Sequence, residues 1–269
     1  MRHARRKLGF VLAASNHGPL IVDRFDYHRV GEGFYGVGGQ ILELSAFDPE
    51  EIDLLLSLLR CRRQHFGDGA MMIDCGANIG VHTIEAAIAM TGWGAVLAIE
   101  AQERLYYALA GNIALNNCFN ARALHAAVAA TDGTMRVPVP DYLSPASFGS
   151  LELRPRPQNE FIGQKIDYSD AATQEIRTVA LDSLKLPRAD FLKIDVEGME
   201  AEVLTGAAGL IATHRPIIMV EWVKSSKPQL SGVLQAEGYR VFEMRMNLLA
   251  VHQGDPSLAQ IRQQPAATP

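Results

Sequence analysis

The sequence predicts an α/β fold in which a mostly parallel sheet carries helices on both faces. From residue 70 onward, strand-like apolar runs alternate with helix-like segments, which is typical of βαβ units. The first of these runs leads into a glycine turn, and several later runs end in an acidic residue. Because ligands bind at the carboxyl ends of parallel strands, the same pattern also predicts a binding site at that edge.

Length and composition narrow the class of protein. The chain has 269 residues, of which 48% are hydrophobic and 20% charged, as in an ordinary globular protein. This length suggests one domain of about 200 residues with additional segments. The net charge of −5 argues against nucleic acid as a partner, because polyanion binding needs a basic surface. We therefore expect a small-molecule or glycan substrate.

Cysteine usage and hydropathy indicate a compartment. The three cysteines share no metal-type spacing, so neither a zinc site nor a disulfide framework is expected. No apolar run approaches the roughly 20 residues that cross a bilayer. The basic start of the chain, followed by the apolar residues 8–14, is similar to a signal peptide, but the apolar part is short. We expect a cytoplasmic protein without a membrane partner.

Residues 1–67 are expected to form an N-terminal element rich in strands and ending in a helix. Short apolar stretches alternate with glycine turns from residue 8 to residue 47, which favours β structure. An exposed strand edge there would allow pairing into a homo-oligomer. Asp48 and Pro49 then provide an N-cap and a first helical residue. The apolar residues that follow on one helix face are Ile52, Leu55, Leu56 and Leu59.

Residues 68–253 are expected to form the main domain. Strand, helix, strand, helix and strand follow one another at 70–74, 78–90, 95–100, 102–116 and 122–129. After a strand at 134–139, the segment 140–169 is rich in Pro, Ser, Gly and Asn, which is typical of a substrate loop or a disordered segment. Strands at 176–179, 189–195 and 216–222 and helices at 198–213 and 229–237 complete the pattern.

The end of the chain predicts one more feature of the sheet. Two strand-like segments, 239–244 and 247–252, are separated by a short turn, which indicates an antiparallel hairpin at the sheet edge. The segment 254–269 is dominated by Gln, Pro and Ala, and we expect it to be disordered.

The turn after the first strand of the main domain is the first candidate site. Its candidate ligand-binding residues are Asp74, Gly76, Ala77, Asn78 and Gly80. Glycines allow close backbone approach to a ligand, and the helix that follows presents free N–H groups. A phosphate loop would need a lysine and a dinucleotide loop the pattern GxGxxG, and both are missing. The carboxylate suits a cationic ligand group, although a tight turn without a ligand remains the alternative.

The next strand ends at Glu100, which lies 24 residues after Gly76 and is followed by Ala101. An acidic side chain at the tip of the neighbouring strand can bind both hydroxyls of a ribose. Taken alone, Glu100 could equally be a solvated acid at a strand end. Together with the glycine turn, it indicates an adenosine without a phosphate.

A third candidate site follows a later strand. Asp195 and Glu197 lie at its end, and Glu221 ends the strand after it. Such acids could orient a substrate hydroxyl and remove its proton, whereas the alternative role of Glu197 is to cap the following helix. Lys193, buried in the strand, needs a partner, for which Asp182 or Glu221 is expected. Acids alone do not establish a metal, and none is predicted.

Four further residues have weaker functional interpretations. His82 and His125 lie near predicted strand ends or in the first helix, but a lone histidine is more often structural than catalytic. Ser147 and Ser150 lie in the irregular segment and could line a substrate pocket. For both serines an ordinary role in the loop is the favoured interpretation.

Four motifs occur in a characteristic order. They are the stretch Ile73-Asp74-Cys75-Gly76-Ala77-Asn78-Ile79-Gly80, the pattern formed by Leu109, Asn112 and Asn116, the stretch Val179-Ala180-Leu181-Asp182-Ser183-Leu184, and Leu192-Lys193-Ile194-Asp195-Val196-Glu197-Gly198-Met199-Glu200 followed by Val203, Leu204, Gly206 and Ala207. Together, over about residues 70–223, they resemble the FkbM family of class I methyltransferases.

The resemblance implies a Rossmann-like class I methyltransferase sheet and S-adenosyl-L-methionine as methyl donor. It also implies, commonly, O-methylation of sugars or of polyketide and other secondary-metabolite hydroxyls. Family members often have Glu-Pro after the second strand, where this chain has Glu100-Ala101-Gln102. That departure keeps Glu100, the acid expected to bind the ribose, but changes the contacts expected for adenine next to it.

The residues and the resemblance together predict a mechanism. Asp74 and the loop backbone would position the methionine part of the cofactor and Glu100 the ribose, while Asp195, with Glu197, would orient and deprotonate the acceptor hydroxyl. A nicotinamide-dependent oxidoreductase is an alternative, disfavoured by the missing GxGxxG. A catalytically inactive methyltransferase-like interaction module is another, disfavoured by the intact loop and acids.

Overall fold

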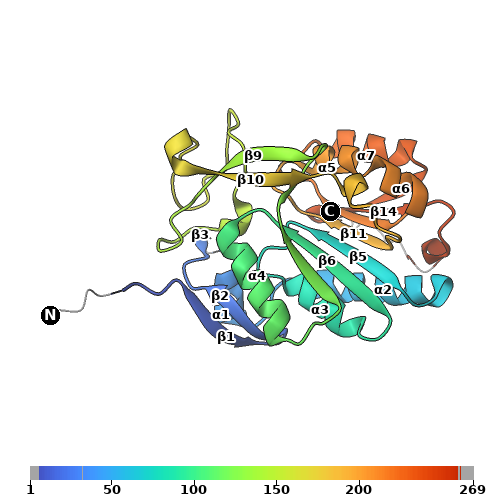
Figure 1. The fold of residues 1–269 in the computed structure, drawn as a ribbon, viewed down its shortest axis with the longest axis horizontal. Coiled ribbons are helices and arrows are strands. Elements are labelled where there is room, and N and C mark those ends of the chain that lie inside the picture. The colour runs from blue at the N-terminus through green and yellow to red at the C-terminus, as the bar shows by residue number, and fades with distance from the viewer. Residues whose placement is uncertain (1–5, 32, 260, 262–269) are drawn as a thin grey trace.

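A seven-stranded sheet forms the centre of the computed structural model, which describes residues 6–31, 33–259 and 261 (Figure 1). In sheet order its strands are β13 (Tyr239–Met244), β14 (Asn247–His252), β12 (Ile217–Glu221), β11 (Phe191–Ile194), β5 (Ala70–Cys75), β6 (Gly94–Glu100) and β7 (Ala121–His125). The five strands from β12 to β7 pair in parallel, and β14 is antiparallel to both of its neighbours. The predicted mostly parallel sheet and its edge hairpin are confirmed.

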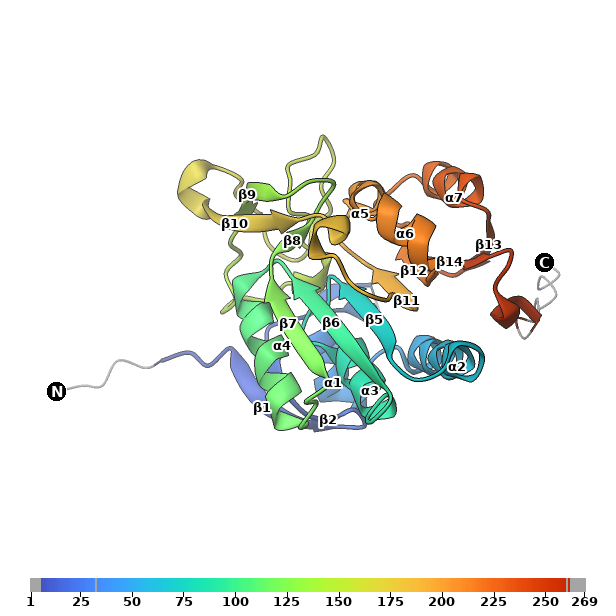
Figure 2. The same cartoon turned by 45° about the vertical axis from the view of Figure 1, so that its right-hand side comes forward.

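Helices cover both faces of the sheet (Figure 2). Next to one face lie α2 (Pro49–Phe66), α3 (Val81–Ala89) and α4 (Glu103–Leu115), and next to the other α5 (Glu200–Gly206), α6 (Ala208–His214) and α7 (Lys227–Ala236). Successive strand residues belong to opposite cores: Met72 packs in the cluster that includes α2 and α3, and Ile73 in the cluster that includes α5 to α7. Two-sided burial explains why the central strands read as continuous apolar runs.

Two predicted helices differ in detail from the structure. Asp48 is the N-cap residue of α2, as predicted, but it has a left-handed φ of 41° and its side chain forms no capping hydrogen bond. The helix expected at 198–213 begins at Glu200 and is divided at Ala207 into α5 and α6. The division has a physical reason, because the Asp182 carboxylate accepts hydrogen bonds from Gly209 N and Leu210 N and thereby caps α6 separately.

The N-terminal segment is partly as predicted. Its strands are β1 (Phe10–Ser15), β2 (Gly18–Asp23), β3 (His28–Val30) and β4 (Gly33–Tyr35). The β structure expected at 37–44 is wrong, because these residues form α1 (Val37–Leu44), with Val37 and Ile41 buried one helical turn apart. The first five residues of the signal-like segment lie outside the described residues, and the apolar part from Phe10 onward is β1.

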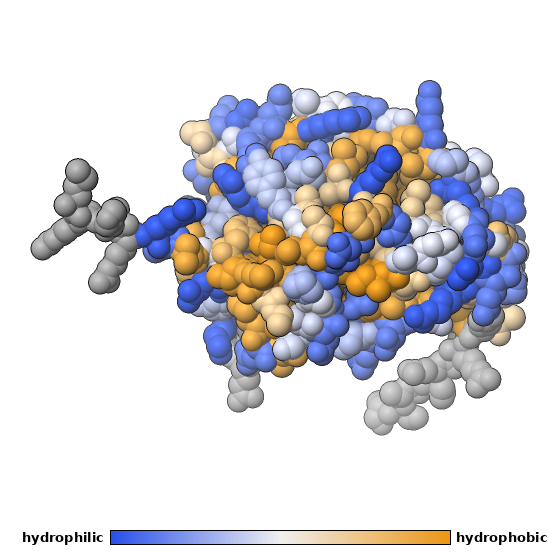
Figure 3. Space-filling view, turned by 60° about the horizontal axis from the view of Figure 1, so that its bottom comes forward, coloured by the Kyte–Doolittle hydropathy of each residue, from blue (hydrophilic) through white to orange (hydrophobic). Residues whose placement is uncertain are grey.

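Strand β2 packs against α4 below the sheet, with β1 and α1 beside β2 (Figure 1). The buried side chain of Asn112 in α4 accepts a hydrogen bond from Ile21 N and donates to Ile79 O, so it joins β2 to the turn after β5. Figure 3 shows apolar side chains gathered on this lower face. Leu12 of β1 and Leu44 of α1 are 66% and 61% exposed. The domain boundary at residue 67 stays a prediction.

A smaller sheet lies above the main one (Figure 1). It consists of β8 (Ala127–Val128), β10 (Thr173–Val179) and β9 (Gly133–Pro138), in that order. The strand predicted at 122–129 is therefore two strands, β7 and β8, in different sheets.

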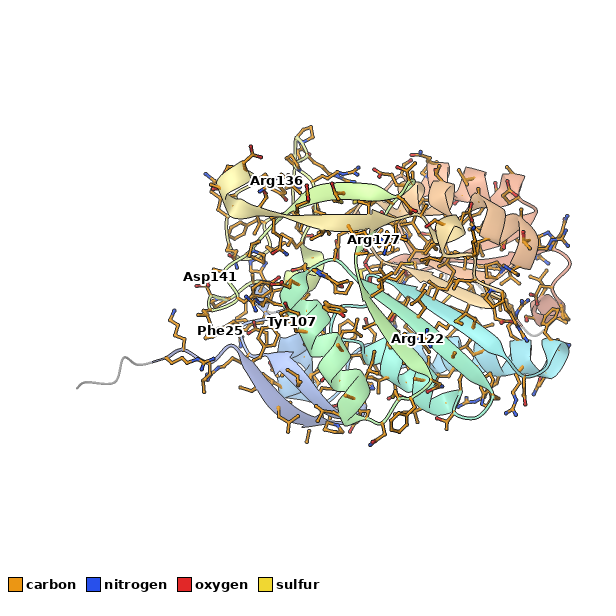
Figure 4. All side chains as sticks on the ribbon, viewed as in Figure 1. Phe25, Tyr107, Arg122, Arg136, Asp141 and Arg177 are labelled. Carbon is orange, nitrogen blue, oxygen red and sulfur yellow. The ribbon has the colours of Figure 1, made fainter. Side chains whose placement is uncertain are left out.

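Residues 139–172, called the long loop below, connect β9 to β10. The long loop is irregular but packed, with Phe148, Leu151 and Ile162 buried. Ala146 N donates to Phe25 O at 3.0 Å where the loop meets the N-terminal segment, in the region of Asp141 and Phe25 in Figure 4. Of the two interpretations of this segment, the packing supports an ordered loop.

The segment after β14 also differs from expectation. Pro256–Ala259 form a 3-10 turn, and the Asp255 carboxylate forms an ion pair with Arg62 of α2. Burial of this pair holds the first tail residues in place, and residues 260 and 262–269 lie outside the described part. The three cysteines, all described, are free and buried. Within the described part of the chain, no helix combines the length and hydropathy of a membrane span.

Candidate functional site

A cavity of about 380 Å³ opens at the carboxyl ends of the central strands. Its floor contains the ends of β5, β6, β11 and β12, so it lies at the edge where the sequence predicts a site. The N-terminal segment contributes Tyr35, Gln40 and Glu51 to its walls, and the long loop contributes Ser147 and Ser150. Three parts of the chain therefore enclose one space, of a size usual for small-molecule sites.

The glycine turn after β5 is shaped by its protein neighbours. Gly76 has φ +81°, and a Cβ added there would lie 1.7 Å from the backbone oxygen of Asp195. Gly76 N and Ala77 N both donate to Ile99 O. Gly80, at φ +92°, lies so close to α4 that a Cβ would meet the Leu109 side chain at 2.5 Å. The sequence predicts that these glycines allow close approach of a ligand. In the structure, the atoms that approach Gly76 and Gly80 closely belong to the protein itself.

Asp74 lies at the end of β5 and is 1% exposed. Its Oδ2 accepts a hydrogen bond of 2.7 Å from Thr83 Oγ1. Its Oδ1 is buried and has no hydrogen-bond partner in the described part of the chain, although the residue lines the cavity. Because buried carboxylate oxygens are normally paired, this atom is suited to accept a hydrogen bond from a bound ligand.

Glu100, at the end of β6, is 5% exposed and supports the glycine turn. Its Oε2 accepts from Asn78 N at 2.9 Å and its Oε1 from Gln102 N at 2.7 Å. Burial raises the pKa of Glu100 to about 7, against the opposing effect of these backbone hydrogen bonds. Each oxygen keeps a second lone pair, so Glu100 can hold the turn and still accept a hydroxyl. Ala101 lies beside it on the cavity wall.

The long loop covers the same end of the cavity. Gln102 Nε2 donates to Phe148 O at 2.8 Å, and a Cβ on Gly149 would lie 2.7 Å from Asn78 Nδ2. Ser147 and Ser150 line the cavity with their hydroxyl oxygens 2.9 Å apart. The pocket-lining interpretation of the two serines therefore fits the structure.

Asp195, Glu197 and Glu221 come together in the cavity where β11 and β12 end. One carboxyl oxygen from each lies within 4.8 Å of the other two. Burial, and next the charge of Asp195, raise the pKa of Glu197 well above its usual value and the pKa of Glu221 to about 8. These three residues, called the acid cluster below, could share protons with a hydroxyl group or surround a cation. The absence of a metal stays a prediction.

Two lysines neutralise part of the acid cluster. Lys193 Nζ is 3.1 Å from Asp195 Oδ2, whereas neither expected partner of Lys193, Asp182 or Glu221, forms an ion pair with it. Lys224 Nζ is 2.6 Å from Glu197 Oε2. The chain itself therefore supplies positive charge beside the acid cluster.

The capping role considered for Glu197 belongs to another acid. Glu200 Oε1 accepts hydrogen bonds from Val196 N and Gly198 N, just before α5. Glu197 is therefore free to contact Lys224, three residues beyond the end of β12. Sequence analysis missed Lys224, although a lysine three residues after the strand-end acid Glu221 was a usable signal.

A second missed residue comes from the N-terminal segment. Glu51 of α2 lines the cavity, with its Oε1 3.1 Å from His82 Nε2 and its Oε2 2.7 Å from the donor Asn247 Nδ2. Burial would raise the pKa of Glu51, but the contact with His82 and the charge of Lys193 lower it to about 2. His82 is thus part of the cavity.

His125 has a different environment from His82. Its Nε2 lies 3.1 Å from Ala101 O, and its ring stacks on Tyr106. Among the residues that line the cavity, His125 is not present. The structural interpretation of this histidine fits its surroundings.

Comparison with known proteins identifies similar chains. The family model described as the methyltransferase FkbM domain matches residues 74–249, more than half of the chain. The methyltransferase sdnD of Sordaria araneosa is 26% identical over 259 residues, which cover 86% of this chain and 92% of that protein.

Solved structures give weaker similarities. The methyltransferase FkbM of Methylobacillus flagellatus KT matches with a TM-score of 0.48 and 19% identity over 69% of this chain, which spans only 44% of that longer chain. An O-methyltransferase from Bacillus cereus in complex with SAH matches with a TM-score of 0.44 and 16% identity, over 77% of this chain and 83% of that one.

Proposed function

Because the chain belongs to the FkbM family of methyltransferases, we propose that it transfers the methyl group of S-adenosyl-L-methionine to a hydroxyl group of an uncharged sugar or secondary-metabolite-type acceptor. The observation that carries this proposal is the convergence of Asp195, Glu197 and Glu221 in the cavity that also contains the glycine turn. A proton acceptor and a candidate cofactor site thus share one enclosed space.

The residues at the glycine-turn end fit the cofactor. Asp74 Oδ1, buried and without a partner in the described residues, would accept a hydrogen bond from the methionine ammonium group. Glu100 would accept from the ribose hydroxyls with its remaining lone pairs. Gly76, Ala77, Asn78, Gly80 and Ala101 would form the adjoining wall. When bound, S-adenosyl-L-methionine supplies an activated methyl group.

The acid cluster would bind and deprotonate the acceptor hydroxyl. Asp195 is paired with Lys193, which holds its carboxyl group in a position to orient the hydroxyl as a hydrogen-bond acceptor. Glu221 has no Lys or Arg within ion-pair distance in the described part of the chain, and burial raises its pKa to about 8. A base is most effective when its pKa is near the working pH. We therefore assign proton removal to Glu221 and orientation to Asp195, with Glu197 beside them.

The charge of the cavity favours an uncharged acceptor. Lys193 and Lys224 are the only lysine or arginine side chains on its walls, judged from the described residues. Each is already in contact with a carboxylate of the acid cluster. A phosphate or carboxylate on the acceptor would find no free cation and would face several acids, which is unfavourable.

The proposal also includes the setting of the reaction. We propose a cytoplasmic enzyme that acts on a small molecule or glycan and needs neither nucleic acid nor a membrane as partner. The exposed apolar side chains of β1 and α1 make the N-terminal face a candidate for self-association into a homo-oligomer.

The test is methyl transfer to a small-molecule extract. The protein is incubated with the extract and S-adenosyl-L-methionine carrying a labelled methyl group, and the labelled products are identified by mass spectrometry and NMR. The expected product carries the label on oxygen of an uncharged compound. Glu221→Gln should lose activity by at least about 100-fold, while Glu243→Gln, on the exposed side of β13, should keep it. A label on nitrogen or carbon would contradict the proposal.

A further inference from the structure

Lys224 is the residue at which the long loop meets the acid cluster. Its Nζ lies 2.6 Å from Glu197 Oε2, 2.6 Å from the backbone oxygen of Ser150 and 2.8 Å from Glu160 Oε2. Ser150 and Glu160 belong to the long loop, ten residues apart, whereas Glu197 belongs to the acid cluster. One ammonium group therefore connects two stretches of the loop to a proposed catalytic acid.

Three protein oxygens surround the Lys224 ammonium group, one as a hydrogen-bond acceptor and two as ion-pair partners. An ammonium group has three N–H donors, and three oxygens surround it at 2.6 to 2.8 Å. Only 10% of the side chain is exposed, so water has little access to compete for these donors. Lys224 is thus placed to hold protein oxygens together rather than to bind a substrate.

Arg156 strengthens the same junction from the loop side. Its guanidinium donates to Gly198 O, next to Glu197, and to Lys224 O at 2.6 Å. Glu152, 5% exposed, accepts from Glu160 N at 2.8 Å and lies 3.5 Å from Arg156. The loop segment 150–160 is therefore internally bonded and is attached to the acid cluster at two neighbouring points.

We propose that Lys224 is a positioning residue that builds the acceptor side of the cavity, by holding the Glu197 carboxylate and the loop segment 150–160 in one fixed arrangement. That this side receives the acceptor rests on the proposed function. The attachment itself rests only on the three contacts of Lys224. Cofactor binding around Asp74 should depend little on Lys224, because none of the three contacts of its ammonium group involves Asp74 or Glu100.

Removing the ammonium group should release the loop. In Lys224→Met, Glu197 and Glu160 lose their cation and Ser150 O loses its donor. An unpaired buried acid is unfavourable, so Glu197 should take up a proton. The ammonium group that attracts Glu160 of the loop is also gone. The contacts of Arg156, and the ion pair of Arg154 with Glu202 of α5, then remain to keep the segment near the acid cluster.

Amide hydrogen exchange measured by mass spectrometry tests this expectation, on the full chain with and without S-adenosylhomocysteine. In Lys224→Met, peptides that cover residues 148–162 should exchange at least about 5-fold faster, while peptides from β5 and β6 remain unchanged. Lys224→Arg keeps a cation and should restore part of the protection. Lys227→Met is the matched control, because within the described residues the Lys227 ammonium group pairs with the exposed Glu243 and lies over the Trp222 ring, away from the long loop. Equal exchange in wild type and Lys224→Met would overturn the proposal.

A double-mutant cycle separates positioning from a general loss of stability. Glu160→Gln removes one contact of Lys224 from a half-exposed side chain and also serves as the test variant if Lys224→Met does not fold. Because the Glu160 carboxylate acts through its contact with Lys224, the double variant should exchange no faster than Lys224→Met alone, whereas additive effects would contradict a shared role. S-adenosylhomocysteine affinity should stay within about 2-fold of wild type in each variant. Failure of the wild type to bind it would refute the proposed function and leave the exchange result standing.

Discussion

Gly76→Ala gives the sharpest test of how the glycine turn is built. The residue has φ +81°, and its added Cβ would lie 1.7 Å from the backbone oxygen of Asp195. That oxygen follows β11, which is hydrogen-bonded between β5 and β12. Relief of the overlap therefore requires the turn and the end of β11 to separate, which would also displace Asp195 in the acid cluster.

The magnitude follows from comparison with Gly92. Gly92 has the same φ of +81° but no atom within 4 Å of an added Cβ. Gly92→Ala thus measures the left-handed backbone alone, about 1–2 kcal/mol. Gly76→Ala adds a backbone overlap that cannot relax through a rotamer change, and we expect a total destabilisation of about 4–5 kcal/mol or more, a size that needs a specific severe cause.

Differential scanning fluorimetry and calorimetry provide the assay. At roughly 2–4 °C per kcal/mol for a chain of this size, Gly92→Ala should lower Tm by a few degrees, and Gly76→Ala by about 10 °C or more. Binding of S-adenosylhomocysteine should be lost in Gly76→Ala and retained in Gly92→Ala. If the two variants lower Tm equally, the close contact between the glycine turn and β11 does not determine stability, and the reasoning is refuted.

Three further predictions concern buried charge. Asp26→Asn leaves one of two backbone N–H groups without an acceptor and should cost about 1–3 kcal/mol in urea unfolding; an unchanged midpoint would contradict it. Arg62→Met leaves Asp190 and Asp255 buried with fewer partners and should destabilise the folded protein by about 3–5 kcal/mol. An effect below about 1 kcal/mol would contradict this prediction. Burial raises the pKa of Asp26 to about 6 and the pKa of Glu221 to about 8. Because the folded protein then binds protons more tightly than the unfolded chain, Tm should rise as the pH is lowered from 9 to 6, and Glu221→Gln should reduce this slope; a Tm that falls over this range would disprove the assignment.

Strand-end residues were the part of the site that the sequence could predict. Asp74, Glu100 and Asp195 each follow an apolar run, and parallel strands end at one edge of the sheet. Their approach to one cavity therefore follows from the strand pattern alone. The helix at Val37–Leu44 was missed because Gly38 and Gly39 favour turns, and only the burial of Val37 and Ile41 in the assembled core favours the helix.

Contacts that depend on tertiary packing could not be predicted from the sequence. Glu51 reaches the cavity because α2 packs beside α3, where it meets His82. Lys224 gains its role from the position of a long loop that has no sequence period. In both cases the chemistry of the residue was visible in the sequence, but its partners come from distant segments, and no local pattern specifies them.

Calorimetric titration with S-adenosyl-L-methionine and S-adenosylhomocysteine tests the central claim most directly. We expect one binding site per chain, no binding of NAD, and affinity at least about 10-fold weaker in Asp74→Asn, because the amide lacks the charge that attracts an ammonium group. Asp53→Asn, exposed on α2, should bind as the wild type does. Absence of binding to the wild-type chain, or equal affinity in Asp74→Asn, would contradict the account of the cofactor site.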